Sequence, residues 1–168
     1  IYHQYDPFDA AHGGPVLWNH LTTKDFVTYE NHGPVLFPDS DLDSSGAYSG
    51  SAFVRDGKIH YFYTGSVKHF DRDDYDYVLT GREQNQIHVV AENPDELGEK
   101  RIAVGPVDYP DDIGTHVRDP KILEHDGIYY MVLGARTKDD RGCVLVYTSS
   151  NLEDWSYATR IELGEKFG

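Results

Sequence analysis

Two segments of this sequence, 70 positions apart, carry the same strand–turn–strand pattern. Residues Ala52–Gly57 align on Ile122–Gly127, so that an Asp-Gly pair stands between two hydrophobic runs in both copies. An Asp-Gly pair in this setting is the strongest short-range signal of a β-hairpin. The same alignment superposes Ser49 on Asp119, and it predicts that these residues hold equivalent positions on the first strands of two neighbouring sheets.

A second element occurs in three copies that begin roughly 55 to 70 residues apart. Residues His20–Tyr29 align on Val146–Trp155, and a looser copy lies between them at Ile87–Leu97. Each copy follows a hydrophobic hairpin, which predicts one four-stranded sheet per repeat. Sheets of this size with this spacing are typical of β-propeller blades, whose edges are shielded by closure of the ring. The chain has room for fewer than three such blades.

The hydrophobic runs are short, and they are rich in Val, Ile, Tyr and Phe. Gly, Pro or Asp interrupts them about every ten residues, and no helical periodicity is evident. With 168 residues, 39% of them hydrophobic, the chain is long enough to bury a core. We therefore expect one all-β domain over residues 1–168.

The formal net charge of −14 excludes the usual means of nucleic-acid binding, in which Lys and Arg neutralise phosphates. No run of 18 apolar residues is present, so we expect no membrane span. Acidic residues cluster at 39–43 and 71–76, but neither cluster fits the glycine and glutamate positions of a calcium-binding loop. Both are predicted to be solvated loops, and we expect no metal and no cofactor.

The single cysteine, Cys143, lies within an apolar strand pattern and is predicted to be buried and inert. The absence of a second cysteine favours a reducing compartment, so we expect a cytoplasmic protein, and a secreted protein is the alternative if a signal peptide precedes this sequence. His20 and His116 have no partner at metal-ligand spacing and are expected to be structural. The first residues form a strand pattern without an initial methionine, which predicts that the natural protein begins further upstream.

Six short motifs, taken in chain order, resemble those of glycoside hydrolase family 32, the β-fructofuranosidases. The resemblance spans Tyr2 to Trp155, and the agreement of the motifs in order is more specific than any one of them. The motifs are Tyr2-His3-Gln4-Tyr5-Asp6-Pro7, Trp18-Asn19-His20, Thr23 to Glu30, Asp43 to Ala52, Tyr63-Thr64-Gly65, and Arg118-Asp119-Pro120-Lys121.

The resemblance implies a five-bladed β-propeller, of which this chain covers part of the first blade to the third. It also implies a retaining hydrolase of β-fructofuranosides, such as sucrose, its 6-phosphate or fructans. The family's nucleophilic Asp precedes the strand matched by Tyr2–Pro7, and its acid/base Glu follows the last residues of this chain. We therefore expect both catalytic carboxylates to lie outside these 168 residues, and the isolated chain to be inactive.

The same resemblance assigns Asp119 to stabilisation of the transition state through hydrogen bonds from adjacent fructose hydroxyls. An ionised carboxylate suits this role, because it only accepts hydrogen bonds and its charge strengthens them. Arg118 is expected to orient Asp119 or to lower the pKa of its carboxyl group. Pro120 is expected to hold Asp119 in an extended backbone conformation.

Four further residues are predicted to contact the saccharide. Gln4 would exchange hydrogen bonds with sugar hydroxyls, and Trp18 would form an apolar wall or exclude water. Tyr48 would pack on the fructose, and Ser49 would donate a hydrogen bond to it.

Two other functions fit the same motifs. One is a related five-bladed glycosidase or glycoside phosphorylase, since Arg-Asp-Pro motifs recur among such propellers. The other is a carbohydrate-binding or structural propeller module without catalysis, which the expected absence of both catalytic carboxylates favours.

Overall fold

The computed structural model describes residues 2–5, 15–94, 96–162 and 164. Within these residues the secondary structure consists of strands and one 3-10 turn at Pro106–Asp108. The strands are β1 (Tyr2–Tyr5), β2 (Leu17–Thr22), β3 (Glu30–Leu36), β4 (Ala47–Arg55), β5 (Lys58–Lys68), β6 (Arg82–Asn93), β7 (Glu96–Leu97), β8 (Arg101–Val104), β9 (Ile113–His125), β10 (Ile128–Thr137), β11 (Gly142–Ser149) and β12 (Ser156–Glu162). The described part of the chain contains no helix with the length and hydrophobicity that crossing a membrane requires.

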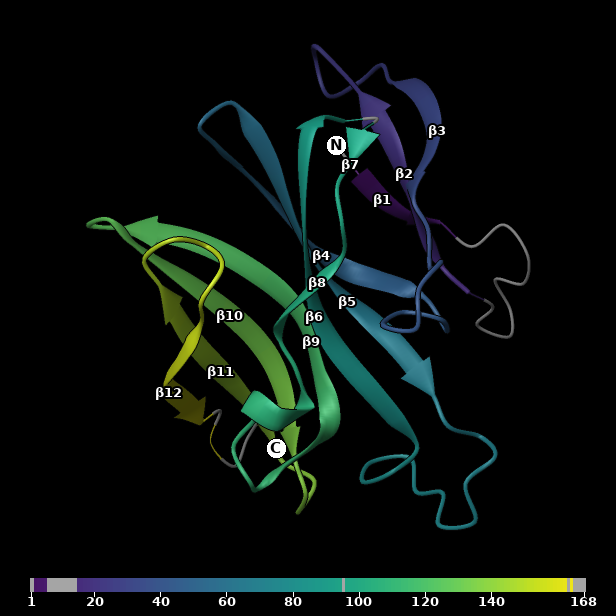
Figure 1. Cartoon of the computed structure of the whole chain (residues 1–168), viewed down its shortest axis with the longest axis vertical. Coiled ribbons are helices and arrows are strands. Elements are labelled where there is room, and N and C mark those ends of the chain that lie inside the picture. The colour runs from purple at the N-terminus through teal and green to yellow at the C-terminus, as the bar shows by residue number, and fades with distance from the viewer. Residues whose placement is uncertain (1, 6–14, 95, 163, 165–168) are drawn as a thin grey trace.

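The strands form three separate antiparallel sheets (Figure 1). The first contains β1, β2 and β3 in that order, and the third contains β9 to β12 as a simple meander. The second contains β4, β5, β6 and β7, with β8 also paired to β6. Strand β4 of the second sheet packs against β9 of the third, so the first strand of one meander adjoins the first strand of the next.

Two hydrophobic cores fill the spaces between successive sheets. Trp18 and Leu36 of the first sheet pack on Tyr61, Tyr63 and neighbours in the second. Phe62 and Val104 of the second sheet pack on a larger set of residues from the third, including the predicted buried thiol of Cys143. Sheets packed face to face in sequence order are the arrangement of propeller blades, and the predicted all-β propeller architecture is confirmed.

The 70-residue repeat is present in the register of the hairpins. Arg55 pairs with Lys58, and His125 pairs with Ile128, at the equivalent places beside the turns. In the turns, Asp56 and Asp126 both have a φ of 50°, and the glycines after them have φ of 76° and 75°. Two successive positive φ angles define the type I′ turn, in which the strand twist is continued and glycine avoids a steric cost.

The turn that ends the second repeated element is also conserved between its first and last copies. The Thr23 hydroxyl accepts a hydrogen bond from the backbone N–H of Phe26 at 2.9 Å, and the Ser149 hydroxyl accepts one from that of Leu152 at 3.0 Å. Phe26 and Leu152 both adopt a left-handed backbone, with φ of 57° and 69°. Short hydroxyl side chains stabilise such turns locally, which is why the pattern is visible in the sequence.

Candidate functional site

Asp119 lies where the pairing of β9 with β10 is interrupted. Lys121 pairs with Val132 and Arg118 pairs with Gly134, so Asp119 and Pro120 fall within a break in the ladder. The equivalent break in β4 lies between Gly50 and Ala47 and contains Tyr48 and Ser49. The predicted equivalence of Ser49 and Asp119 is therefore confirmed, and both lie on first strands at a β-bulge, a feature often found next to active sites.

The backbone of Asp119 is left-handed, with a φ of 63°. The expectation that Pro120 would keep this residue extended is wrong. The steric rule for a residue before proline disfavours the right-handed helical region, whereas tertiary hydrogen bonds fix the backbone here in a third region. Aspartate tolerates that region better than most residues, but it still costs about 1–2 kcal/mol.

Those hydrogen bonds come from the second sheet. The N–H of Asp119 donates to Thr64 Oγ1 at 2.9 Å, and the Thr64 hydroxyl donates in turn to Gln86 Oε1 at 2.8 Å. The Gln86 amide then donates to the carbonyl of Val117 at 2.9 Å. Residues on β5 and β6 thus hold both sides of the bulge in β9.

A second contact secures the other end of the bulge. The hydroxyl of Ser51, on β4, donates to the carbonyl of Pro120 at 2.8 Å and accepts from the N–H of Ile122 at 3.2 Å. Sequence reasoning did not select Ser51, Thr64 or Gln86 as functional residues. Ser51 and Thr64 lie within the quoted motifs, but nothing in the sequence shows that they contact the Arg-Asp-Pro segment.

The Asp119 side chain is exposed, and its carboxylate has no hydrogen-bond or ion-pair partner among the described residues. The whole network contacts the backbone and leaves this carboxylate available. An unpaired, solvent-facing carboxylate on a rigid bulge can accept hydrogen bonds from two neighbouring hydroxyls of a ligand.

Arg118 contacts a histidine rather than the adjacent carboxylate. Its Nη2 donates to His116 Nδ1 at 3.1 Å, while His116 Nε2 donates to the carbonyl of Tyr77 at 2.9 Å. Burial is the main cause that lowers the pKa of His116 below its usual value, and this favours the neutral ring that both contacts require. His116 is a structural histidine, as expected, and it fixes the position of Arg118.

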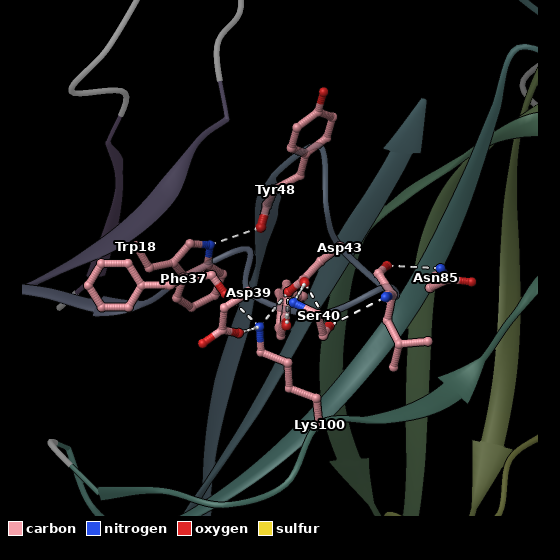
Figure 2. A network of polar contacts seen from close by, with 10 residues as sticks. Trp18, Phe37, Asp39, Ser40, Asp43, Tyr48, Asn85 and Lys100 are labelled. Atoms are coloured by element: carbon pink, nitrogen blue, oxygen red, sulfur yellow. Dashed lines mark hydrogen bonds and ion pairs between the residues drawn. The ribbon is translucent and has the colours of Figure 1, made fainter. Parts of the chain in front are cut away.

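Trp18 does not form the predicted sugar-facing wall. Trp18 is 5% exposed, and its ring makes T-shaped contacts with Tyr61 and Tyr63 in the core between the first two sheets. Its indole N–H donates to the carbonyl of Tyr48 at 2.9 Å (Figure 2). Trp18 therefore helps to fix the backbone of the bulge that carries Tyr48 and Ser49.

Three further residues were predicted to contact the saccharide. Tyr48 and Ser49 lie at the bulge of β4, and the side chain of Gln4 is not among those that the structure describes. Tyr48 is partly exposed and its ring points away from Trp18 (Figure 2), while Ser49 is exposed. Gln4 lies on β1, where its backbone pairs with that of Trp18, and its side chain is outside the described part of the structure.

The loop before β4 is not simply solvated, contrary to expectation. Asp43 is completely buried, and its carboxylate accepts hydrogen bonds from the Tyr63 hydroxyl at 2.7 Å and from the N–H and hydroxyl of Ser40 at 3.0 and 2.7 Å. Lys100 donates to the same carboxylate at 2.7 Å and also pairs with Asp39 (Figure 2). This pair fixes the loop that leads into the Tyr48–Ser49 bulge. Within the described residues no cluster of His, Cys, Asp and Glu could hold a metal ion.

Three antiparallel sheets packed in sequence, with an exposed carboxylate on a bulge of a first strand, define part of a β-propeller. The family model for the glycosyl hydrolases family 32 N-terminal domain matches residues 1–167. The chain belongs to glycosyl hydrolase family 32.

Curated relatives and solved structures agree with this assignment. The chain is 34% identical to the sucrose-6-phosphate hydrolase of Bacillus subtilis (strain 168) over 157 residues, which are 94% of this chain and 30% of that protein. It is 36% identical to the sucrose-6-phosphate hydrolase of Klebsiella pneumoniae over 156 residues, which are 92% of this chain and 31% of that protein. The structure of the sucrose-6-phosphate hydrolase from Lactobacillus gasseri matches with a TM-score of 0.83 and 32% identity, over 98% of this chain and 32% of that one. The chain thus spans about a third of the length of the relatives it matches.

Proposed function

We propose that this chain supplies the fructosyl-binding carboxylate, Asp119, of a β-fructofuranosidase that acts by the retaining mechanism. The observation that supports this most strongly is the unpaired Asp119 carboxylate on a bulge whose backbone is held by three side chains of the neighbouring sheet. Its acceptor-only chemistry suits a pair of sugar hydroxyls.

In a retaining hydrolysis, one carboxylate attacks the anomeric carbon and a second carboxyl group protonates the leaving oxygen. Asp119 performs neither step in this proposal. It holds the hydroxyls of the fructosyl ring, and its hydrogen bonds strengthen as the ring gains positive charge in the oxocarbenium-like transition state. Such selective strengthening is what raises the rate of the chemical step.

The names of the relatives support a substrate built on sucrose, and several of them are sucrose-6-phosphate hydrolases. We propose sucrose and its 6-phosphate as the first substrates to test, with inulin as a polymeric comparison.

Asp119→Asn in the full-length protein should lower kcat by a factor between about ten and somewhat more than about ten thousand, and change KM much less. One or two charge-assisted hydrogen bonds, each worth roughly 1.5–3 kcal/mol, would be lost in the transition state. Steady-state release of fructose from each substrate measures both constants, and the thermal midpoint of the same preparation shows whether the variant is folded. A folded variant with wild-type kcat would remove Asp119 from the site. A wild-type protein that binds these sugars without releasing fructose would instead identify a carbohydrate-binding module.

A further inference from the structure

The ring of Tyr48 lies directly over the backbone of Gly46. A Cβ atom at position 46 would lie 2.7 Å from Cε1 of Tyr48, 3.1 Å from its Cδ1 and 3.1 Å from Cγ2 of Val16. Gly46 also has a φ of 144°, in the region that favours glycine. The ring therefore occupies the space that any larger residue at position 46 would need.

Tyr48 is also fixed through its backbone. Its carbonyl accepts the hydrogen bond from the indole of Trp18, and its ring points away from that contact (Figure 2). The residue is nevertheless partly exposed. An aromatic ring that is held in place and still partly exposed can pack on a ligand with little loss of conformational freedom.

Gly46 itself is held on both sides of its Cα. Its N–H donates to the carbonyl of Asp43 at 2.7 Å, and its carbonyl accepts from the N–H of Ser66, on β5, at 2.9 Å. The next N–H, of Ala47, donates to the carbonyl of Val16 at 2.9 Å. The segment under the ring is thus joined to β5 and to the residue before β2.

Asp43 anchors the beginning of this segment. Its buried carboxylate binds Lys100 and the hydroxyl of Tyr63, at 2.7 Å each. A Cβ atom on Gly65 would lie 2.9 Å from Cβ of Asp43, so the loop rests directly on the backbone of β5. The carbonyl that receives the N–H of Gly46 therefore has a fixed position.

Strand β5 supports both bulges of the candidate site. Tyr63 donates to Asp43, in the loop that leads to Tyr48, and Thr64 accepts from the amide of Asp119. Neighbouring residues of a strand point to opposite faces of the sheet, so β5 supports one bulge from each face. The loop before β4 is thereby held by the same strand that holds Asp119.

Asp43 and Gly46 depart from the 70-residue repeat. The equivalent positions are Ile113 and His116, both buried and neither with a positive φ. The third sheet is therefore built without a buried carboxylate or a glycine at these places. A buried ion pair often adds no stability over apolar residues of similar volume, which favours a role in geometry for Asp43 and Lys100.

We propose that Gly46 is a positioning residue for Tyr48, and that the buried pair of Asp43 and Lys100 holds Gly46 in place. The inference rests on the proposed function, with the ring of Tyr48 packed on the fructosyl ring. A packing contact does not respond to the charge that develops in the transition state, so it stabilises ground state and transition state alike. Its loss raises KM and leaves kcat nearly unchanged, the reverse of the result expected for Asp119→Asn.

The test measures KM and kcat for sucrose with the full-length protein, together with its affinity for fructose by calorimetry and its thermal midpoint. Gly46→Ala should raise KM about tenfold to a hundredfold, because displacement of the ring by about 1 Å removes its contact with the sugar. Tyr48→Ala should raise KM similarly. Gly46→Ala should add nothing in that background, because the ring that it displaces is already absent.

Two matched controls separate the contact from general destabilisation. Gly57 has a φ of 76° in an exposed turn, and a Cβ atom there would meet nothing within 4 Å, so Gly57→Ala strains the backbone without a steric contact. It should keep the wild-type KM. Lys100→Met should raise KM because it releases the anchor, whereas Lys58→Met, in an exposed pair with Glu92, should not.

Wild-type KM in folded Gly46→Ala or Lys100→Met would overturn the proposal. So would an equal rise of KM in Gly57→Ala, or additive effects of Gly46→Ala and Tyr48→Ala. Fructose affinity separates this result from a failure of the proposed hydrolysis. A wild-type protein that binds fructose but releases none from any substrate contradicts hydrolysis alone, and Gly46→Ala should still weaken fructose binding about tenfold or more. A wild-type protein that neither binds nor releases fructose would overturn both proposals.

Discussion

At Asp119 the requirements of the backbone and of the side chain conflict. The φ of 63° favours glycine, whereas the proposed sugar contact requires a carboxylate. Strain of this kind persists where the surrounding structure fixes it, and here Thr64 and Ser51 do so. Residues of this type are expected to be optimised for function at the expense of stability.

This conflict predicts that Asp119→Gly raises the free energy of unfolding by up to about 1 kcal/mol while activity is lost. Glycine adopts the left-handed conformation without the steric cost, and part of the gain is offset by its greater freedom in the unfolded chain. Urea unfolding of the purified variants measures the change. Asp119→Val is the opposite control, because a β-branched residue at this φ should destabilise the protein, and equal stability of the two variants would contradict the argument.

Two residues show where sequence reasoning failed at this scale. Pro120 restricts its neighbour by a local steric rule, but hydrogen bonds from another sheet override that rule at Asp119. Trp18 belongs to a recognisable motif, and the motif does not reveal that its ring faces the core. Both errors concern contacts between residues far apart in the chain.

Among the elements, the bulge in β9 depends on hydroxyls supplied by neighbouring strands. Thr64→Val should lower the free energy of unfolding by about 1–3 kcal/mol, because it leaves the Asp119 N–H and the side-chain Oε1 of Gln86 without their partner. It should also lower kcat in the full-length protein, since the bulge carries the carboxylate. Ser66→Ala is the control on the same strand: Ser66 is equally buried but contacts Gln84 instead. It should lose stability and retain kcat, and a similar loss of kcat in both variants would exclude a specific role for Thr64.

The pair between Lys100 and Asp43 fixes the loop before β4 to the segment between β7 and β8. Lys100→Met should destabilise the protein by about 3 kcal/mol, because the buried carboxylate of Asp43 loses its counter-charge. Lys58→Met removes a lysine from an exposed pair with Glu92 and should change stability by less than about 1 kcal/mol. Chemical denaturation measures the free energy of unfolding of both variants, and equal losses of stability in the two would contradict the assignment of a buried pair.

The hairpins could be predicted from the sequence because their signals are local. An Asp-Gly turn and alternating apolar residues determine the register over a few positions, and the same register appears in both copies. The buried state of Asp43 could not be predicted, because an acidic cluster next to a turn has the composition of a solvated loop. Its partners Tyr63 and Lys100 are far away in the sequence.

At the scale of the whole molecule, the interface between the second and third sheets contains a pair of histidines. His60 Nδ1 and His88 Nε2 are 2.9 Å apart, and the His88 ring stacks on Phe62 at 4.3 Å between centroids. Phe62 in turn contacts Trp155, in the loop between β11 and β12 of the third sheet. Burial, followed by the nearby His60 and Arg101, lowers the pKa of His88 from 6.5 to about 4.

Stability should therefore fall as the pH drops from about 6.5 towards 4. In this range the unfolded chain binds a proton at His88 and the folded protein does not, so protonation favours unfolding. The complete loss attributable to His88 is on the order of 3 kcal/mol. The free energy of unfolding should differ less between pH 7.5 and pH 5 in His88→Phe than in the wild type. The exposed His125→Gln should show the same difference as the wild type. A difference of wild-type size in His88→Phe would refute the assignment.

The hydrogen bond from the Asp119 amide to Thr64 joins two different sheets, and this determines when that amide can exchange its hydrogen with solvent. Amides inside the hairpin ladders are released by fraying of a single sheet, whereas the Asp119 amide is released by separation of the second and third sheets. Its exchange rate therefore measures how often the second and third sheets separate. The carboxylate proposed to bind sugar thus lies on the residue whose amide reports whether the blades are joined.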